Sequence, residues 1–499
     1  MRFPRDMRDV RGVRQRSRLS LCSSALLLLS ACAAQKPPSS SIPPGPTSHS
    51  ASDGAASEKV SITVYNQNFG LVREIRAVHL GKGTVELAYH DVSAHIQPES
   101  VHLKSLGSDD GLSVLEQNYR YDLLNPTTLL EKYLGKTVKV YRYNEHTGTE
   151  EEKQATILSV EGGTVLNIDG QITSNFPGRF AFPQVPENLV QKPTLVWLLS
   201  SAAADQRVEV TYLTQELNWQ ADYVLSIDAD DKLGDLSGWV TLRNNTGTSY
   251  KNAELKLVAG DVQRIAPTTP VMEDAPMPMA SAAPMAPPQF KEEGLFEYHL
   301  YALDRPTTLL DKEQKQVSLL SASSIKLDKK LIFFGAAQYF RGNYGQVVSN
   351  QKVGVYLDIQ NKEDNHLGMP LPKGTLRVYK SDKAGQTQFI GEDSIDHTPR
   401  DEKLRVKLGE AFDVVADRTE TSWQAISSCV NESSWEIKLR NHKDTAETVL
   451  VSEPAGGDWE IVSSSLPATK KDASTFTFDV PLAARSETKL TYRVRVRWC

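Results

Sequence analysis

The sequence predicts an all-β protein made of several antiparallel sandwich or barrel domains, with very few short helices. Short segments such as Val60–Tyr65 alternate apolar and polar residues with the period of two that a half-buried strand requires. Turn-forming runs rich in Gly, Asn, Asp and Ser separate these segments, and no long helical period interrupts the second half. The final stretch, 431–499, has the length and strand spacing of an immunoglobulin-like sandwich.

The N-terminus predicts export and lipid attachment. Residues 1–18 carry seven arginines, and the apolar run that follows, Leu19–Leu29, is too short to span a bilayer. Residues 29–32, Leu-Ser-Ala-Cys, resemble the bacterial lipobox, in which the cysteine is acylated and becomes the new N-terminus. We therefore expect 1–31 to be a signal peptide and Cys32 to anchor the protein in the cell envelope. By resemblance to Gram-negative sorting rules, Ala33 favours the outer membrane, with the protein facing the periplasm.

Composition divides the rest of the chain into segments. Residues 32–58 are mainly Pro, Ser, Ala and Gly, which predicts a disordered tether. A long Met-, Pro- and Ala-rich loop is expected at 262–294. The predicted folded parts are an N-terminal β-domain at 59–120, a short helix with a small β-barrel at 121–192, a larger β-domain at 193–430 that contains this loop, and the C-terminal sandwich at 431–499.

One short sequence occurs in two similar copies, at 121–132 and at 301–312. Both contain Pro-Thr-Thr-Leu-Leu, at 126–130 and 306–310. The first copy begins with a capping asparagine and ends before a glycine, which predicts a helix. The second copy runs into a segment that is typical of a turn and strand. We interpret the echo as coincidence and not as a duplicated domain.

The second half of the chain contains an ordered series of small motifs. They are Trp219–Tyr223, Gly238–Asn245, Tyr250–Ala253, Leu257–Asp261, Gly374–Tyr379, Phe389–Glu392, Arg440–Lys443, Glu453-Pro454, Asp458-Trp459 and Tyr492–Trp498. In these motifs the chain resembles the bacterial DUF4139 family, a group named for its unknown function. The resemblance covers roughly 195–499 and implies an all-β protein that faces the periplasm. The Trp219–Tyr223 segment is also similar to the mucoidy-inhibitor relatives of that group. No activity, cofactor or catalytic residue follows from the resemblance.

Charge and cysteine content narrow the function classes. Without residues 1–31 the chain keeps 49 basic and 60 acidic residues, a net charge of −11, which argues against binding nucleic acid. Cys429 and Cys499 could pair in an oxidising compartment. Against this, their positions at strand ends would lie far apart if the first and last strands of the sandwich ran parallel. The sequence leaves the disulfide open.

Two sets of residues are candidate binding groups. Trp219, Tyr223 and Trp239 form either core packing or an exposed aromatic surface for a glycan or peptide. The thioethers of Met272, Met277, Met279 and Met285 suit Cu(I), although a plain linker or a partner-binding loop fits the same composition. No zinc-ligand spacing, EF-hand loop or P-loop is present, and we expect no cofactor.

The first functional hypothesis is a non-enzymatic envelope lipoprotein that binds or scaffolds another envelope protein. The membrane would be its second partner, through the lipid on Cys32. One alternative is a hydrolase of envelope polymers, because Asp222, Glu392 and Asp393 are acidic residues near aromatic ones. Turn and strand-end acids explain the same residues, and no Gly-x-Ser-x-Gly elbow occurs. The other alternative is a metal-handling protein that uses the Met-rich loop.

Overall fold

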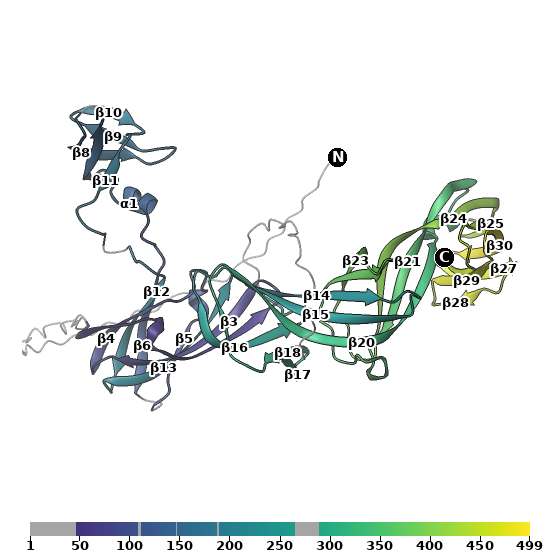
Figure 1. Cartoon of the computed structure of the whole chain (residues 1–499), viewed down its shortest axis with the longest axis horizontal. Coiled ribbons are helices and arrows are strands. Elements are labelled where there is room, and N and C mark those ends of the chain that lie inside the picture. Colours follow the sequence, from purple (N-terminus) through teal and green to yellow (C-terminus); the bar gives the residue numbers. More distant parts are fainter. Residues whose placement is uncertain (1–45, 108–110, 146, 187–188, 265–288) are drawn as a thin grey trace, which may run out of the picture. The chain divides into compact units, whose positions relative to one another are not determined.

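The computed structural model describes residues 46–107, 111–145, 147–186, 189–264 and 289–499, and its strands confirm the all-β prediction. Within these ranges α1, Pro126–Lys132, is the single α-helix (Figure 1). The predicted antiparallel order is too simple, because three of the four sheets contain a parallel pair: β1 with β4, β2 with β16, and β14 with β22. Parallel partners lie far apart in sequence, so residue alternation does not reveal them.

The first hydrophobic core lies between strands of three sheets. The four-stranded sheet has the order β1-β4-β12-β6, formed by Ser48–Ser52, Gly83–His90, Thr194–Ser201 and Leu112–Arg120. The eight-stranded sheet has the order β17-β18-β16-β2-β3-β13-β5, with β19 on β16. Its strands are Phe290–Leu295, Tyr298–Leu303, Tyr250–Ala259, Ser57–Tyr65, Phe69–His79, Asp205–Gln215, His102–Ser105 and Thr307–Leu309. The third sheet contributes its first strands, β14 and β15 at Leu217–Ile227 and Leu233–Asn244.

The predicted boundary between domains 59–120 and 193–430 does not separate two cores. Ile62 from the first segment and Trp219 from the second belong to one continuous hydrophobic cluster. The reason is strand pairing, because β2 lies between β3 and β16, and β16 comes from the second segment. A strand forms backbone hydrogen bonds with whichever strand edge is adjacent in space, however far apart the two strands are in the sequence.

The 121–192 segment has a core of its own, as the sequence suggested. Its sheet has the order β10-β9-β8-β7-β11, and Tyr133, Val140 and Ile157 are buried in its core. Among the described residues β10 and β11 have one strand neighbour each, so the segment is an open sheet and the predicted barrel is wrong. Its strands, in chain order, are Thr137–Asn144, Thr149–Ser159, Val165–Ile168, Gln171–Ser174 and Arg179–Ala181.

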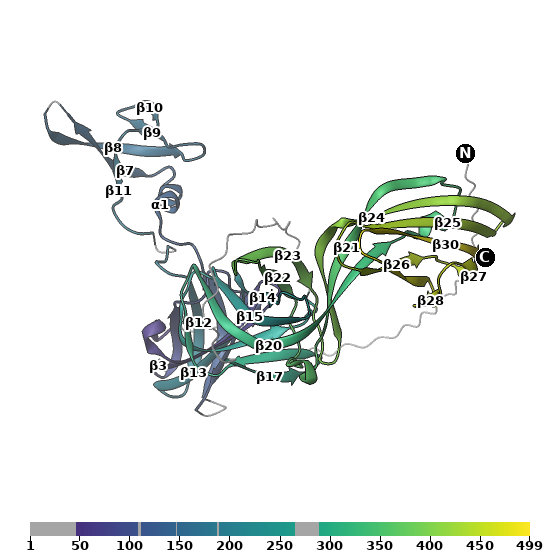
Figure 2. The same cartoon turned by 45° about the vertical axis from the view of Figure 1, so that its right-hand side comes forward.

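Three long strands connect the first core with the C-terminal one. They are β20, β21 and β24, at Glu313–Phe334, Gln346–Gln360 and Lys403–Ser427 (Figure 2). Leu327 of β20 is buried in the first core, and Leu331 of the same strand is buried in the second. The other strands of this sheet are β22 Gly374–Ser381, β23 Thr387–Ile395, β25 Val430–Asn441, β26 Glu447–Pro454, β27 Asp458–Ser464, β28 Thr469–Lys470, β29 Thr475–Leu482 and β30 Ser486–Arg497.

The C-terminal core has the two packed layers expected of a sandwich. Tyr492 on β30 packs against Phe476 and Phe478 on β29, and Trp435 on β25 is buried in the same core. The predicted start at residue 431 is wrong, because Leu331 and Val414 are also buried in this core. Residue 431 lies just after the turn that joins β24 to β25, where Ser427 pairs with Val430.

Ordered structure begins earlier than the predicted tether allows. Residues 48–52 form β1, which pairs in parallel with β4 from Ser48↔Val85 to Ser52↔Tyr89. The 3-10 helix at Gly54–Ala56 and the start of β2 follow it. Backbone hydrogen bonds hold β1 in place although its side chains are small and polar, so the low apolar content of 32–58 did not predict this strand.

Candidate functional site

The candidate site is a cavity of about 750 Å³ where β2 and β16 separate. These strands pair in parallel from Ser61↔Glu254 to Tyr65↔Val258. Before that point, Ser57–Val60 pair with β3 alone, and Tyr250–Ala253 pair with β19 alone. We call the gap between these two four-residue edges the β2–β16 split. The cavity is lined by both edges and by the inner face of β3.

The β2–β16 split exposes strand backbone inside a cavity. Each non-proline residue of a strand carries one N–H and one C=O that a neighbouring strand normally satisfies. Among the described residues no strand occupies the side of Ser57–Val60 that faces β16, or the side of Tyr250–Ala253 that faces β2. The split therefore offers two strand edges to an incoming group.

A hydrogen-bonded pair of buried charges lies on the inner wall of the cavity. Arg76 is fully buried, and its Nη2 donates to Glu74 Oε2 at 2.8 Å. Its Nη1 donates to the carbonyls of Ser52 at 3.1 Å and His90 at 2.9 Å. The guanidinium lies 3.6 Å from the ring centroid of Tyr89, whose hydroxyl donates to Glu74 Oε2 at 3.0 Å. Arg76 therefore joins three strands, β1, β3 and β4.

The ionisation states of this wall follow from burial and pairing. Burial lowers the pKa of Arg76, but the nearby Tyr89 and Glu74 more than offset it, so the pKa is raised and the guanidinium stays charged. Burial, chiefly, raises the pKa values of Tyr89, Tyr212 and Tyr250. These phenols are neutral at physiological pH, so none of them is a phenolate base.

The rim of the cavity is held by ion pairs and backbone hydrogen bonds. Asp91 bridges Lys192 at 2.5 Å and accepts from the Gly54 N–H at 3.0 Å. Burial raises the pKa of Asp91, but these hydrogen bonds outweigh burial and the pKa is lowered. Where the strands meet, Glu254 accepts from Lys59 at 2.7 Å and from Ser61 at 2.9 Å.

Several polar groups of the lining have no partner in the described part of the chain. They include the Nε of Arg76, the hydroxyl of Tyr250 and the hydroxyl of Ser57, all buried. Lys251 is exposed at the mouth, and no ion pair holds it there. A buried polar group without a partner costs about 1–3 kcal/mol, which marks this wall as unusual for a purely structural one.

The arrangement fits binding better than catalysis. The Glu74 and Asp91 carboxylates are engaged by Arg76 and Lys192, and the phenols are protonated. In the described ranges no three His, Cys, Asp or Glu side chains are grouped so that they could hold a metal ion. The site presents strand edges and neutralised polar walls, with no activated nucleophile beside a base.

Of the two alternatives for the aromatic residues, core packing holds for Trp219 and Tyr223. Trp219 and Tyr223 are buried, at 2% and 0% exposed. Trp219 Nε1 donates to the Val258 carbonyl at 3.2 Å, and the Tyr223 hydroxyl donates to the Pro372 carbonyl at 2.8 Å. The polar atoms of these two residues are satisfied inside the core, so their rings serve packing and not ligand contact. Trp239 is half-buried.

The acidic residues considered for hydrolysis are held in structural contacts. Asp222 is buried, accepts from the Thr241 hydroxyl at 2.6 Å and bridges Arg377 at 3.2 Å. Arg377 also bridges Glu392 at 3.1 Å, so the structure does bring these two carboxylates to one arginine. Asp393 accepts from the Lys407 N–H at 2.7 Å. None of the three lines the cavity at β2 and β16, and their contacts form a network of ion pairs and hydrogen bonds within the sheet.

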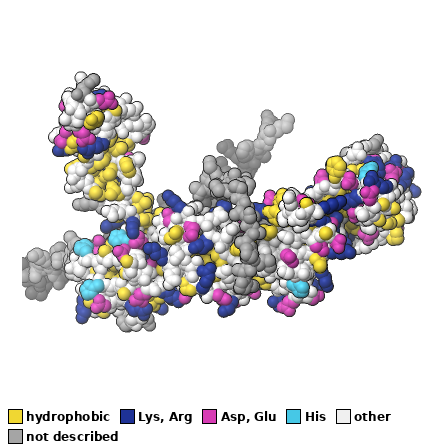
Figure 3. Space-filling view, viewed as in Figure 1, with side chains coloured by type: hydrophobic (Ala, Val, Ile, Leu, Met, Phe, Trp, Pro, Cys, Tyr) yellow, Lys and Arg dark blue, Asp and Glu magenta, His cyan; other side chains and the backbone are white. Residues whose placement is uncertain are grey.

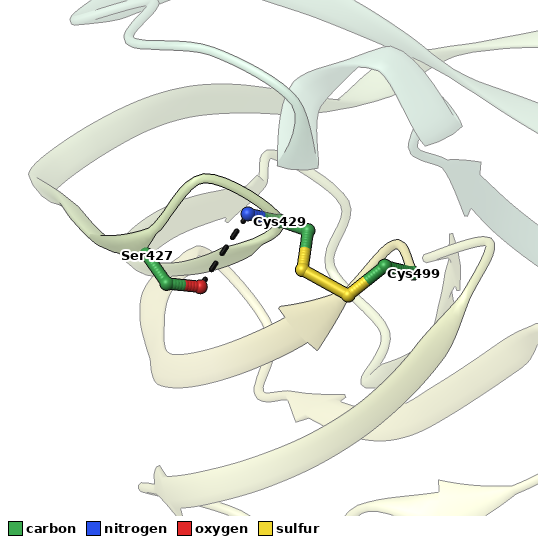
Figure 4. The surroundings of a disulfide bond; sticks show 3 residues. All are labelled: Ser427, Cys429 and Cys499. Carbon is green, nitrogen blue, oxygen red and sulfur yellow. Dashed lines mark hydrogen bonds between the residues drawn. A yellow bond between two sulfur atoms is a disulfide. The ribbon is translucent and has the colours of Figure 1, made fainter.

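Cys429 and Cys499 are joined in a disulfide, with their Cα atoms 5.7 Å apart (Figure 4). The expectation that these strand ends lie far apart is wrong. β25 and β30 are antiparallel neighbours, with Val430 opposite Arg497, so the start of one lies beside the end of the other. The Trp498 N–H also donates to the Cys429 carbonyl at 2.8 Å.

Two predicted sites lie outside the described residues: Cys32 and the methionines at 272, 277, 279 and 285. Sequence reasoning in turn missed Arg76, Glu74 and Tyr250. One signal was available for the first two. In the β3 sequence Val72-Arg-Glu-Ile-Arg76-Ala-Val78, charged residues occupy positions 74 and 76 between the core residues Val72 and Val78. Charges at inward positions of a strand indicate a buried polar function.

No helix in the described ranges is both long and apolar enough to cross a membrane. Among curated proteins, none matches this sequence. The family model for the domain of unknown function DUF4139 matches residues 208–499, more than half of the chain. It includes β16 and Asp311 of the cavity, whereas β2 and β3 precede it. The match confirms the resemblance seen in the sequence, and the chain belongs to the DUF4139 family.

Proposed function

We propose that this protein is a non-enzymatic lipoprotein of the bacterial cell envelope that binds or scaffolds another envelope protein. The observation that carries the proposal is the β2–β16 split, where the facing sides of two strands line one cavity and have no strand neighbour within the described ranges. Proteins use free strand edges to bind extended segments of partners, with main-chain hydrogen bonds supplying affinity.

The electrostatics of the surface support a protein partner over a polyanion. Basic and acidic side chains are interspersed on the face drawn in Figure 3, and the chain as a whole carries a formal charge of −6. A binder of nucleic acid needs a concentrated basic surface. Mixed charge and exposed backbone edges suit a protein strand.

The cellular location, or address, of the protein is part of the same proposal. We infer that residues 1–31 are removed, that lipid on Cys32 holds the protein to the outer membrane, and that the β-structure faces the periplasm. The lipobox-like residues 29–32 and Ala33 support this address. The cysteines at 429 and 499 fit it, because disulfides persist in the oxidising periplasm. Kinship with the mucoidy-inhibitor group is proposed on the Trp219–Tyr223 segment.

Chemical crosslinking in intact envelopes, followed by affinity purification of the tagged protein, tests the binding function. We expect the same envelope protein to be recovered with crosslinkers of different chemistry. Recovery of the tagged protein alone under all of them would contradict the proposal. A Cys429→Ser/Cys499→Ser variant that retains the fold is a useful control, because it removes thiol exchange as a source of captured proteins.

The substitution Cys32→Ser tests the lipid anchor. It removes the thiol that is acylated, so we expect an uncleaved or soluble protein in fractionated cells. Ser24, within the proposed signal, gives the control Ser24→Ala, which leaves the cysteine intact and should fractionate with membranes. A Cys32→Ser protein that is cleaved and still membrane-bound would show that lipid on this residue is not the anchor.

A further inference from the structure

We propose that the β2–β16 split receives an extended peptide segment of a partner protein, which adds a strand between Ser57–Val60 and Tyr250–Ala253. The inference rests on the proposed binding function and names the site and the kind of ligand. It follows from the sheet topology, because a single strand inserted there would have an edge of β2 on one side and an edge of β16 on the other.

The split stays open because each of the two strands that border it is paired with another strand on its far side. Tyr250 pairs with Leu309 and Ala253 with Thr307, with a change of register between them, so the start of β16 follows β19. On the other side, Ser57 pairs with Arg76 and Lys59 with Ile75, across a bulge. Bulges bend a strand away from its neighbour and are common beside binding sites. Glu254, with Lys59 and Ser61, fixes the point where pairing resumes.

The lining favours a ligand without net charge that both donates and accepts hydrogen bonds. Arg76, Lys59 and Lys192 are neutralised by Glu74, Glu254 and Asp91. The two other aspartates of the lining accept backbone N–H groups, Asp53 from Ala55 at 2.9 Å and Asp311 from Gly247 at 2.8 Å. Lys251 is the one cation of the lining without an ion pair among the described residues, so a charged ligand would find few free counter-charges. Peptide groups, by contrast, supply donors and acceptors without charge.

The split selects a peptide over another neutral polar ligand such as a sugar. Strand edges present N–H and C=O groups at a repeat of about 3.3 Å per residue, which an extended peptide matches and a pyranose ring does not. Sugar sites also use exposed aromatic faces, but the rings of the lining, Tyr212 and Tyr250, are 1% and 4% exposed. The volume of about 750 Å³ lies within the range of roughly 300–1,000 Å³ that encloses small ligands.

The inner wall specifies the side chain that the segment turns inward. Alternate residues of a strand point to opposite faces, so two side chains of a four-residue peptide strand face the wall formed by Glu74, Arg76 and Tyr250. This wall is polar and neutral overall. We therefore expect a short uncharged polar side chain, such as Ser, Thr or Asn, at the inward position. An apolar side chain there would leave the polar wall without hydrogen bonds.

The test uses the full-length mature protein and a pool of fluorescein-labelled heptapeptides of the pattern Thr-X-Thr-X-Thr-X-Thr, with X randomised. A twin pool carries N-methyl groups on the fixed threonines, which removes alternate N–H donors and keeps every side chain. We expect members of the first pool to bind and their N-methylated twins to bind at least ten-fold more weakly. Bound peptide should slow hydrogen exchange at least ten-fold at those amides of Ser57–Val60 and Tyr250–Ala253 that point into the split.

A matched pair of variants locates the peptide. Ser57→Phe places a large ring on the lining, whereas Thr63→Phe adds the same ring to the paired part of β2. We expect at least ten-fold weaker binding for Ser57→Phe and wild-type binding for Thr63→Phe. Hydrogen exchange of β3 and β13 amides verifies that each variant is folded. The twin pools test the same point in the wild-type protein, so an unfolded variant does not end the test.

Three results would each overturn the proposed site. The first is that no peptide of the pool binds, and the second is that the N-methylated twins bind equally well. The third is that chitotriose or maltotriose slows hydrogen exchange at the split whereas no peptide does. Site and function also fail separately. If Ser57→Phe still captures the wild-type partner in envelopes, the binding function stands and the split is not its site. If peptides bind the split but envelopes yield no partner, the site stands and the scaffolding function does not.

Discussion

The sequence Pro-Thr-Thr-Leu-Leu is helical at 126–130, whereas at 306–310 it contains the strand Thr307–Leu309. In the first copy it makes up most of α1, and in the second it contains β19. The second copy also leads to Asp311, on the lining of the cavity. Five identical residues therefore have different structures within one chain, and the difference shows which interactions decide a local structure.

The helical copy is determined by its neighbours in sequence. Asn125 caps the helix, because its Oδ1 accepts from the Thr128 N–H at 3.0 Å, and Pro126 occupies the first turn. Leu129 and Leu130 then pack, half-buried, against the small core of the 121–192 segment. Arg305 takes the place of the asparagine in the second copy and has no acceptor oxygen to cap a helix.

The strand copy is determined by a partner distant in sequence. Thr307 pairs with Ala253 and Leu309 with Tyr250 of β16, and the Leu309 side chain is 1% exposed. The Asn252 N–H donates to the Thr308 hydroxyl at 3.0 Å. Threonine and leucine occur in both helices and strands, so the available cap and the available sheet edge decide between them.

The largest effect is expected from Leu309→Ala. It removes a fully buried side chain from the first core and should lower the free energy of unfolding by about 2–5 kcal/mol. Leu129→Ala, its counterpart in the helix, should cost about half as much, because Leu129 is only half-buried. Urea unfolding measures both. Circular dichroism is the readout, because the 121–192 segment contains no tryptophan whose fluorescence could report its unfolding. An equal cost would mean that burial does not distinguish the copies.

A second, smaller effect separates the residues that precede the shared sequence. Asn125→Ala removes the cap and should cost about 1 kcal/mol, visible as faster hydrogen exchange in α1. Arg305→Ala should change stability by less than about 0.5 kcal/mol, because Arg305 makes only an exposed hydrogen bond to Gln289. The view of α1 as capped by Asn125 fails if the two substitutions have the same effect.

The middle threonines should respond more weakly still. Thr308→Val removes the hydroxyl that accepts from Asn252 and should cost up to about 1 kcal/mol, since this contact is partly exposed. Thr128→Val removes a hydroxyl that accepts from the Asn125 side chain at the surface and should be close to neutral. Urea midpoints of the two variants measure this difference, and a larger loss for Thr128→Val would reverse the assignment.

The smallest difference is expected between the isolated copies. Peptides 121–135 and 301–315 should both lack stable structure in water by circular dichroism, because helices this short are marginal without tertiary contacts. A strongly helical 121–135 peptide would show that local sequence alone fixes α1. A helical 301–315 peptide would show that pairing with β16 overrides a local preference of these residues for helix.

Much of the architecture could be predicted because it depends on local patterns. The alternation in Val60–Tyr65 marked β2, and the Asn125 cap with Pro126 marked α1. The family was also evident from its ordered motifs. The boundary at residue 431 failed, because continuous strands such as β20 pass from one core into the next without a break in their pattern.

The candidate site was beyond the sequence because it depends on pairings across long separations. Ser61 meets Glu254 only after β16 adds to the edge of β2, and Asp311 reaches Gly247 only after β19 pairs with β16. Trp219 and Tyr223, which the sequence left open as core residues or as a binding surface, are buried in the core. An aromatic residue in a strand has the same sequence pattern whether it is covered or exposed.

The sequence by itself determined the all-β class, the family and the helix at Asn125–Lys132, because periodicity, motifs and capping involve residues close together in the chain. The tertiary structure alone decided that β1 precedes β2 as an ordered strand, that Cys429 meets Cys499, and that β2 and β16 part around Arg76. The physical reason is that backbone hydrogen bonds between strands carry no side-chain signature. Which edges meet, and where they separate, emerges only when the whole sheet is assembled.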